Sequence, residues 1–340
     1  MIVSILNRGE EAEWDAFVEH SSEASFFHLS GWRGVIEQAF AHKTFYLCAR
    51  RHGNICGVLP LTQVKSSLFG NALISNAFCV QGGVAAMDDE TSDALRSQAV
   101  EIAKALGVGC IEFRSAQQSP GWQTRNDRYA SFRRPIEPET EKNLKAIPRK
   151  QRAVVRKAIT SGLRSEIDDS TDRLHHIYAA SVRRLGTPVF SRRYFRLLKE
   201  RFGPACDVVT VTANEQPIAS VMNFYFRDEV LPYYGGGLEV ARSLGGNDFL
   251  YWEVMRRAAE RGFRSFDFGR SKVDTGAYHF KCNWGFEPIP LCYEFLPIRD
   301  RLIPDVSPLN PRYRIAVNLW RRLPLAVTKI LGPPIVRCIG

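Results

Sequence analysis

The sequence predicts an α/β protein made of two similar domains, each with a mixed β-sheet flanked by helices. Both halves of the 340-residue chain show helical patterns, then strand-like runs, then a helix that ends at glycine and a short strand with an acidic centre. The amino-acid sequence repeats as well. AKALGVGCIEF, which contains Gly107 and Glu112, matches RAAERGFRSFDF, which contains Gly262 and Asp267, at an offset of 155 residues. Duplication of one domain explains both observations.

In the first half, apolar periodicity and turn residues predict three helices and four strands. The helices are expected at Glu10–Glu19, Gly31–Phe40 and Asp88–Leu106, and the strands at Thr44–Arg50, Ile55–Val64, Ala72–Phe78 and Cys110–Ser115. The third helix opens with several acidic residues, which are favourable at a helix N-terminus.

The second half repeats this order. Helices are expected at Thr171–Leu185, Arg192–Phe202 and Asn247–Arg261, and strands at Asp207–Thr212, Pro217–Phe226, Val230–Tyr234 and Ser265–Gly269. The long strands are apolar almost throughout, as expected for strands that helices cover on both faces. We place the boundary near Pro138–Pro148, so that the expected parts are residues 1–140, 141–298 and a tail of residues 299–340.

The composition is that of a globular protein, with 45% hydrophobic and 24% charged residues. The sequence contains no apolar run long enough to span a membrane and no secretory signal pattern, so we expect a cytoplasmic protein. None of the eight cysteines forms a CxxC pair, which favours reduced, buried thiols over disulfides or zinc. No HExxH or P-loop occurs either, and we expect no metal site.

The net charge of +10 is concentrated in two segments. Residues 142–165 hold eight basic residues and no acidic one, and residues 299–340 hold eight basic and two acidic residues. A polyanion such as tRNA, a phosphorylated cofactor or an anionic membrane would explain them, and so would solvated basic surfaces. The apolar and basic tail, residues 312–340, could lie on the inner membrane as a peripheral segment or pack on the domain core.

Residues that could take part in catalysis or ligand binding are densest between Tyr233 and Glu294. A strand there ends in Gly235–Gly237, and the following loop carries Arg242, Gly245 and Gly246 before a helix that begins at Asn247. Glycines let backbone N–H groups approach a ligand, and a helix N-terminus favours anions. This loop is a candidate binding site for the phosphates of a cofactor. The alternative is an ordinary turn.

The segment FDFGRSKVDTGAYHFKCNWGFEP follows. Asp267 lies in an apolar strand, where a carboxylate needs a partner or a raised pKa. Acyl transfer to an amine needs a base, an oxyanion donor and a proton for the leaving group. Asp267 or His279 is the candidate base, Lys281 or Arg270 the candidate cation, and Tyr234 or Tyr278 the candidate proton donor. On an extended or loop segment, His279 and Lys281 would point the same way. In the alternative interpretation, Asp267 pairs with Arg270 and His279 is a packed core histidine.

The chain has no Gly-x-Ser-x-Gly elbow, and no cysteine lies in a recognisable nucleophile motif. Direct transfer between two bound substrates is therefore preferred over a covalent acyl-enzyme.

Several segments also resemble a known family. They are VRKAITSGL, SVRRLGTPVFSRRYFRLLKERFG, IASVMNFYF, LPYYGGGLEVAR, NDFLYWEVMRRAAERGFRSFDFGRSK and TGAYHFKCNWGFEP. They are similar to FemAB-related proteins that accompany exosortase/PEP-CTERM and exopolysaccharide loci, and to the wider Fem/BioF2-like acyltransferases. The similarity is close over residues 140–295 and looser over residues 15–115.

The resemblance implies tandem GNAT-like domains that transfer an acyl or aminoacyl group to an amine. The Asp-Phe-Gly strand of the family falls on Asp267–Gly269, and its Phe-Lys element falls on Phe280 and Lys281. In Fem enzymes that lysine helps to form the substrate site. The coenzyme A loop of GNAT enzymes matches Arg242, Gly245 and Gly246, although Asn247 stands where Gly or Ala is usual. The resemblance leaves acyl-CoA and aminoacyl-tRNA as the expected donors. No segment is left for the long helical arm of Fem enzymes, which argues against aminoacyl-tRNA.

The expected function is therefore transfer from one of these donors to an amino group of a cell-envelope, exopolysaccharide or peptidoglycan precursor. A non-catalytic scaffold of an envelope system at the membrane surface is the alternative. A third hypothesis is an RNA-binding protein, although aromatic and basic residues do not interleave as in single-strand binders.

Overall fold

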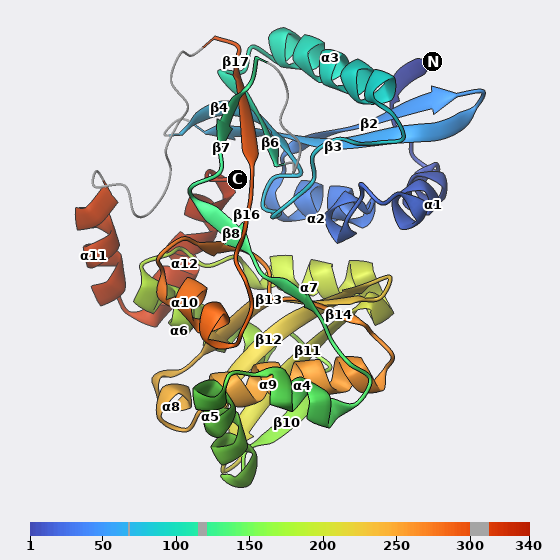
Figure 1. Cartoon of the computed structure of the whole chain (residues 1–340). Coiled ribbons are helices and arrows are strands. Elements are labelled where there is room, and N and C mark those ends of the chain that lie inside the picture. Colours follow the sequence, from blue (N-terminus) through green and yellow to red (C-terminus); the bar gives the residue numbers. More distant parts are fainter. Residues whose placement is uncertain (67–68, 115–120, 300–312) are drawn as a thin grey trace. The chain divides into compact units, whose positions relative to one another are not determined.

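Figure 1 shows the computed structural model, which describes residues 1–66, 69–114, 121–299 and 313–340. Ser115, at the end of an expected strand, and residues 300–312 of the expected tail lie outside the described residues. Each long element expected from the sequence has an observed counterpart. The additional strands contain two to five residues each, which is too short for a periodic signal in the sequence.

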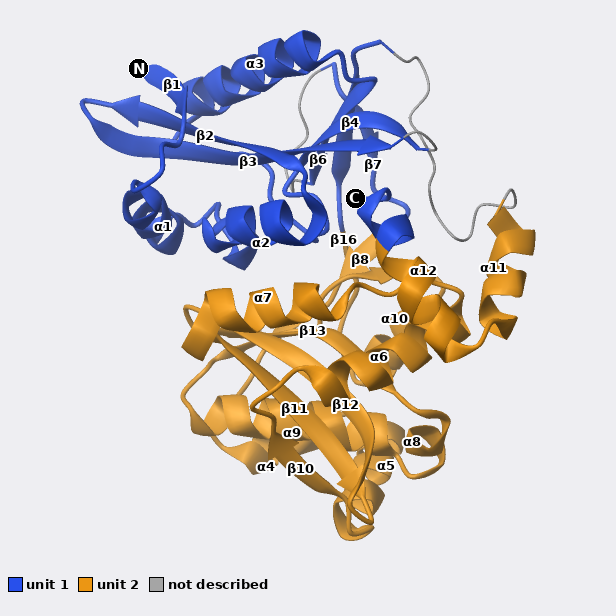
Figure 2. Ribbon diagram, turned by 180° about the vertical axis from the view of Figure 1, so that it is seen from behind, with its two compact units in different colours: residues 1–128, 291–307, 334–340 blue, residues 129–290, 308–333 orange. Residues whose placement is uncertain are grey.

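The chain forms two compact units (Figure 2). Unit 1 contains residues 1–128, 291–307 and 334–340, and unit 2 contains residues 129–290 and 308–333. Residues 129–140 and 291–298 therefore belong to the opposite unit from the one that the sequence boundary assigned. The reason is strand pairing, because the strand at residues 293–297 completes the sheet of unit 1.

Unit 1 has one mixed sheet with helices on both faces. Its strands are β1 (Ile2–Ile5), β2 (Lys43–Arg51), β3 (Asn54–Ser66), β4 (Gly70–Ser75), β5 (Ala85–Ala86), β6 (Cys110–Arg114), β7 (Gln123–Arg125) and β17 (Tyr293–Pro297). The strand order is β1-β2-β3-β4-β6-β17-β7, and β5 pairs with β3. Helix α3 (Asp89–Leu106) lies on one face, and α1 (Glu11–His20) and α2 (Gly31–Phe40) lie on the other (Figure 1).

Unit 2 has a second mixed sheet. Its strands are β9 (Arg133–Pro135), β10 (Arg164–Ile167), β11 (Cys206–Ala213), β12 (Gln216–Phe226), β13 (Glu229–Gly237) and β14 (Ser265–Asp267), in the order β10-β11-β12-β13-β14-β9. A small sheet joins β8 (Tyr129–Ser131), β15 (Ser271–Lys272) and β16 (Ile289–Pro290). The helices are α4 (Thr140–Ala146), α5 (Arg149–Thr160), α6 (Asp172–Leu185), α7 (Arg192–Phe202), α8 (Glu239–Ser243), α9 (Gly246–Glu260), α10 (Gly276–Asn283) and α11 (Arg314–Arg322). Helix α12 (Leu325–Arg337) begins in unit 2.

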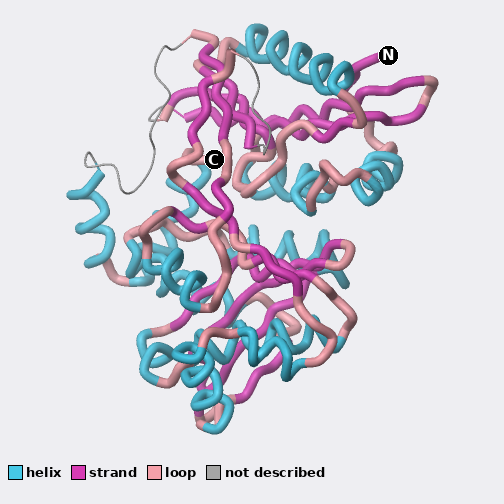
Figure 3. Tube along the Cα trace, in the orientation of Figure 1, coloured by secondary structure: helices cyan, strands magenta, loops and turns pink. Residues whose placement is uncertain are grey.

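Helices cover both faces of the sheet in unit 2, as Figure 3 shows along the chain trace. Helices α6 and α7 pack on one face of the central strands, and α9 packs on the other with α4 and α5 against it. Strand β12 is consequently buried over Ile218–Phe226. This explains why its residues are apolar on both faces instead of alternating.

The two glycines that mark the repeat end corresponding helices. Gly107 follows α3 and Gly262 follows α9, both with positive φ (61° and 87°). Glycine adopts this left-handed conformation without the strain that a Cβ would cause. Each helix can therefore stop there, and the chain turns directly into the next strand of its sheet.

The basic segment at residues 142–165 is not one helix. Ile147 is extended and Pro148 starts a new helix, so α4 and α5 are separate. The cause is that proline disfavours helical geometry in the residue before it. All eight cysteines are free thiols, and six of them are buried. No helix of the described residues is long and apolar enough to cross a membrane.

Candidate active site

The side chain of Lys281 is buried among apolar residues of unit 2, with 8% of the residue exposed. Its Nζ donates to the carbonyl oxygens of Gly269 (2.9 Å) and Arg270 (3.2 Å). The rings of Phe132 and Phe268 lie 5.2 and 5.7 Å from Nζ. Burial lowers the pKa of this amine to about 7, although the nearby Asp267 opposes the shift. The lysine therefore changes protonation state near neutral pH.

Helix α10 determines which side chains reach this position. Thr275 caps the helix, and its hydroxyl accepts from the backbone N–H of Tyr278 (3.4 Å). His279 and Lys281 therefore lie on a helix, and the extended or loop segment on which they could point the same way is not formed. Two residues apart on a helix, they lie on different faces, so Lys281 is buried and His279 is exposed. His279 is not a packed core histidine either.

Asp267 lies beside the lysine. It is the last residue of β14, and its Oδ1 accepts from the backbone N–H of Gly269 (2.7 Å) and from the hydroxyl of Ser131 (3.4 Å). Burial raises the pKa of its carboxyl group, while the charges of Lys281 and Arg133 act in the opposite direction. Asp267 and Lys281 thus bind the N–H and the C=O of the same residue, Gly269.

A second carboxylate belongs to this cluster and was not identified from the sequence. Glu229 opens β13 and forms an ion pair with Arg133, and its Oε2 accepts from the hydroxyl of Ser265 (3.2 Å). Burial and the negative charge of Asp267 raise the pKa of Glu229 to about 7. Glu229 stands opposite Ser265 in the parallel pairing of β13 and β14. Since residues two apart in a strand share a face, that pairing could have placed Glu229 near Asp267.

The two strands that carry these acids separate immediately afterwards. Strands β13 and β14 pair only at Glu229–Ser265 and Val230–Phe266, although β13 continues to Gly237. In α/β proteins, ligands commonly bind at the carboxyl ends of neighbouring strands, where the chain turns away and leaves polar groups at the edge of the sheet. Arg133, which pairs with Glu229, has a side chain that is 54% exposed.

Tyr234 belongs to a different cluster. Its hydroxyl hydrogen-bonds the hydroxyl of Tyr194 (2.8 Å), and its ring packs edge-on against Tyr178 and Phe195. These partners lie on α6 and α7. The structure therefore does not place Tyr234 with the rings of Phe132 and Phe268 that surround Lys281.

The glycines at the end of β13 are explained by close packing of helices. A Cβ on Gly236 would meet Ser181 and Tyr178 of α6, and one on Gly237 would meet the side chain of Asn247 in α9. Helices on both faces approach the strand so closely that a side chain would not fit. The interpretation of this run as a ligand cradle is therefore not needed to explain it.

The candidate cofactor loop forms the junction of α8 and α9. Gly245 has a positive φ of 67° and packs against Val154 and Ala158 of α5. The side chain of Arg242 is exposed, and its positive charge lowers the pKa of nearby Arg184, together with burial. Two arginines therefore lie close to the loop Arg242–Asn247.

The start of α9 also contains a buried carboxylate. Asp248 accepts from Trp284 Nε1 (3.0 Å) and from Gln151 of α5. Negative charge is stabilised in the first helical turn. Arg270, the remaining predicted cofactor residue, lies apart from this turn with its guanidinium 4.5 Å from the ring centre of Tyr129.

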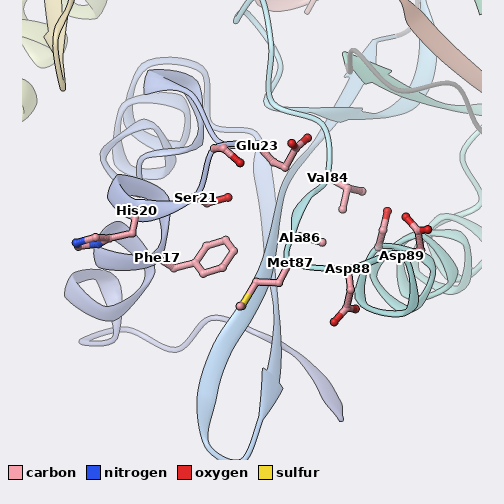
Figure 4. A pocket seen from close by; sticks show the side chains of 11 residues that line it. Phe17, His20, Ser21, Glu23, Val84, Ala86, Met87, Asp88 and Asp89 are labelled. Atoms are coloured by element: carbon pink, nitrogen blue, oxygen red, sulfur yellow. The ribbon is translucent and has the colours of Figure 1, made fainter.

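Figure 4 shows a cavity of about 490 Å³ in unit 1. It is lined by Phe17, His20, Ser21, Ser22, Glu23, Val84, Ala86, Met87, Asp88, Asp89 and Ser92. None of the predicted site residues contributes to it, since all of them belong to unit 2. Asp88 is already engaged there by Arg51 and Thr91. Within the described part of the chain, no group of three or more His, Cys, Asp or Glu side chains is arranged to hold a metal ion.

Comparison with known proteins identifies the architecture. Residues 146–282 match a family model described as an acetyltransferase (GNAT) domain. A crystal structure of FemX aligns with a TM-score of 0.71 at 15% identity, covering 93% of this chain and 100% of FemX. The fold is that of tandem GNAT domains. Both Asp267 and Lys281 lie within the matched residues.

Two further structures support the tandem arrangement. A tandem GNAT protein from the clavulanic acid biosynthesis pathway aligns with a TM-score of 0.56 at 13% identity, covering 87% of this chain and 98% of its own. L-PGS from Bacillus licheniformis aligns with a TM-score of 0.54 at 14% identity, covering 94% and 99%. Comparison with curated proteins gave no significant match.

Proposed function

We propose that the protein is an N-acyltransferase that moves an acyl or aminoacyl group directly from a bound donor to an amine. One observation carries the proposal. A buried amine, Lys281, and a partly exposed carboxylate, Asp267, are held by the same residue, Gly269, at the point where β13 and β14 separate. Shifted pKa values in a polar cluster are typical of groups that exchange protons during catalysis.

The chemistry assigns a role to each group. The acceptor nitrogen forms a bond to the donor carbonyl carbon, and Asp267 accepts the proton that the nitrogen loses. The raised pKa of Asp267 makes it a stronger base than an ordinary carboxylate. Protonated Lys281 stabilises the oxyanion of the tetrahedral intermediate. When the bond to the leaving group breaks, the proton passes to its sulfur or oxygen.

The donor is either acyl-CoA or an aminoacyl-tRNA. Both carry phosphates, and the arginine pair Arg184 and Arg242 next to the Gly245–Asn247 turn supplies positive charge for them. Basic residues of α5, which packs on that turn, extend the positive surface. The acceptor in this proposal is an amino group of a cell-envelope, exopolysaccharide or peptidoglycan precursor, as the family resemblance implies.

A non-catalytic scaffold remains the competing function. Such a protein would gain nothing from a buried amine that titrates near neutral pH, because burial of an ionisable group costs stability. An enzyme gains a group that changes protonation state at working pH. This difference favours the enzyme.

The decisive experiment measures transfer of labelled acyl groups from acyl-CoA, and separately from charged tRNA, to a panel of aminosugars and peptide amines. We expect turnover with one donor class, and loss of that turnover in Lys281→Met. The matched control is Lys104→Met, because Lys104 is an exposed lysine of unit 1. Absence of transfer with both donor classes, or full activity in Lys281→Met, would overturn the proposal.

A further inference from the structure

Helix α11 has apolar residues on two faces, and its contacts with the rest of unit 2 bury only one of them. Val317 packs against the backbone of Gly186 at the end of α6, and Arg321 donates to the carbonyl oxygen of Leu185 (3.3 Å). Trp320, one helical turn from Val317, is buried on the same side. These contacts attach the helix to unit 2 by one face.

A second apolar face of the same helix is exposed. Ile315 and Leu319 are 82% and 62% exposed and stand four residues apart, so they lie side by side on the helix surface. Single exposed apolar residues are common, but an adjacent pair on a helix that already buries apolar residues elsewhere is not explained by packing within the fold.

Basic residues surround this exposed pair. Arg314 and Arg322 are exposed at the two ends of α11, and Asn318 is exposed between them. Residues 313–340 contain no Asp or Glu. Figure 2 shows α11 at the margin of unit 2, with its outer side away from the sheet. The surface formed by Arg314, Ile315, Leu319 and Arg322 is hereafter the α11 face.

We infer that the α11 face docks on an anionic lipid bilayer. Apolar side chains flanked by arginines match the two layers of such a surface, because the acyl region accepts Ile and Leu while lipid phosphates attract Arg. This inference does not depend on the proposed catalytic activity, since no residue of the α11 face belongs to the cluster around Lys281.

The other occupants fit the α11 face less well. A second copy of the chain would bring arginines against arginines, and fewer than three helical turns are too small for a stable interface between two proteins. A nucleic acid would pair with the arginines but would leave Ile315 and Leu319 in water. Of these three occupants, the bilayer satisfies both kinds of residue.

The test is sedimentation of the full-length protein with vesicles of phosphatidylcholine alone and of phosphatidylcholine containing about 30% phosphatidylglycerol. We expect binding only to the anionic vesicles, and weaker binding when salt screens the charges. The double variant Ile315→Asp/Leu319→Asp should lower the affinity roughly tenfold or more, because both apolar contacts are lost. Arg314→Glu/Arg322→Glu should also lower it.

The control variant is Ile167→Asp, which places an aspartate at an isoleucine that is 53% exposed on β10, away from α11. It should bind vesicles as the wild type does. Circular dichroism melting of each variant separates loss of binding from loss of folding. The inference is overturned if the wild type does not bind anionic vesicles, or if the aspartates at positions 315 and 319 leave binding unchanged. It is also overturned if the wild type is a dimer that these aspartates convert to monomers without any vesicle binding.

Discussion

The two units carry an acidic residue at corresponding places, and the surroundings of the two residues differ. In unit 1, Glu112 of β6 forms an ion pair with Arg114 (2.8 Å), and β6 has a paired neighbour on each side along most of its length. In unit 2, Asp267 ends a three-residue strand beside Lys281 and Glu229, and burial raises its pKa.

The same contrast applies to the other charges. Unit 1 buries Arg96 against Glu294 as a complete ion pair (3.1 Å). Unit 2 holds an amine and two carboxylates whose pKa values move towards neutrality. If the proposed function holds, one copy of the fold uses its charges for structure while the other keeps them available for proton transfer.

The largest expected effect is on turnover. Asp267→Asn should lower kcat/KM about 100-fold or more, because the amide cannot accept the proton of the acceptor nitrogen. The corresponding change in unit 1, Glu112→Gln, should leave kcat/KM within about twofold of the wild type. Steady-state kinetics of both proteins check the prediction. Equal losses in the two variants would end the assignment of different roles to the two acids.

The second prediction concerns stability in unit 1. Arg96→Met removes the buried ion pair with Glu294, and we expect the free energy of unfolding to fall by about 3–5 kcal/mol. Arg51, which pairs with Asp88 at the surface, is the control, and Arg51→Met should lower the free energy of unfolding much less. Urea denaturation measures both. If Arg96→Met cost no more than Arg51→Met, unit 1 would not depend on its buried charges.

The third prediction is a gain in the free energy of unfolding, in place of a loss. The pKa of Glu229 is raised from an ordinary value of 4.5 to about 7, so the folded protein binds more protons than the unfolded chain between these values. Stability of the wild type therefore decreases as pH rises from 4.5 to 7. Glu229→Gln removes this loss, and we expect it to be more stable than the wild type by about 2 kcal/mol at pH 8.

The gain from Glu229→Gln should disappear near pH 4, where the glutamate is protonated in both states. Urea titrations at the two pH values provide the comparison. A variant that is less stable than the wild type at pH 8 would show that the ion pair with Arg133 outweighs burial.

The smallest effect is expected at His279. Its side chain points to solvent from α10, and we expect His279→Ala to change kcat/KM by no more than about twofold. Lys281→Met, two residues further along the same helix, should abolish turnover. A pair of assays on these neighbours therefore tests whether the buried face of α10 alone serves the reaction. A large loss in His279→Ala would extend the site to the outer face.

Much of the architecture could be predicted from the sequence, because long strands and helices leave periodic patterns. The helix that ends at Gly107 and the one that ends at Gly262 were visible for that reason. The pairing of β17 with the sheet of unit 1 could not be predicted. Nothing in the sequence of these five residues, near the end of the second half, indicates which strand they pair with.

The candidate site shows the same limit. Asp267 could be predicted because its charge lies in an apolar strand, and Lys281 because it falls on the Phe-Lys element of the family that the sequence resembles. The direction of His279 could not be predicted without knowing that Thr275 caps a helix. Glu229 could not be predicted because it lies in a polar turn sequence, Arg-Asp-Glu, where a glutamate is common. Only the parallel register of β13 with β14 brings it near Asp267.

The interleaved order of the chain has a consequence for dissecting the protein. Among the described residues, the chain passes between the units at residues 128–129, 290–291 and 333–334. A fragment that stops at residue 290 would keep β6 and β7 but remove β17, which pairs with both of them. Unpaired strand edges promote aggregation. Separate expression of the two halves should therefore yield insoluble material, and point substitutions in the full-length chain are the sound way to assign functions to each half.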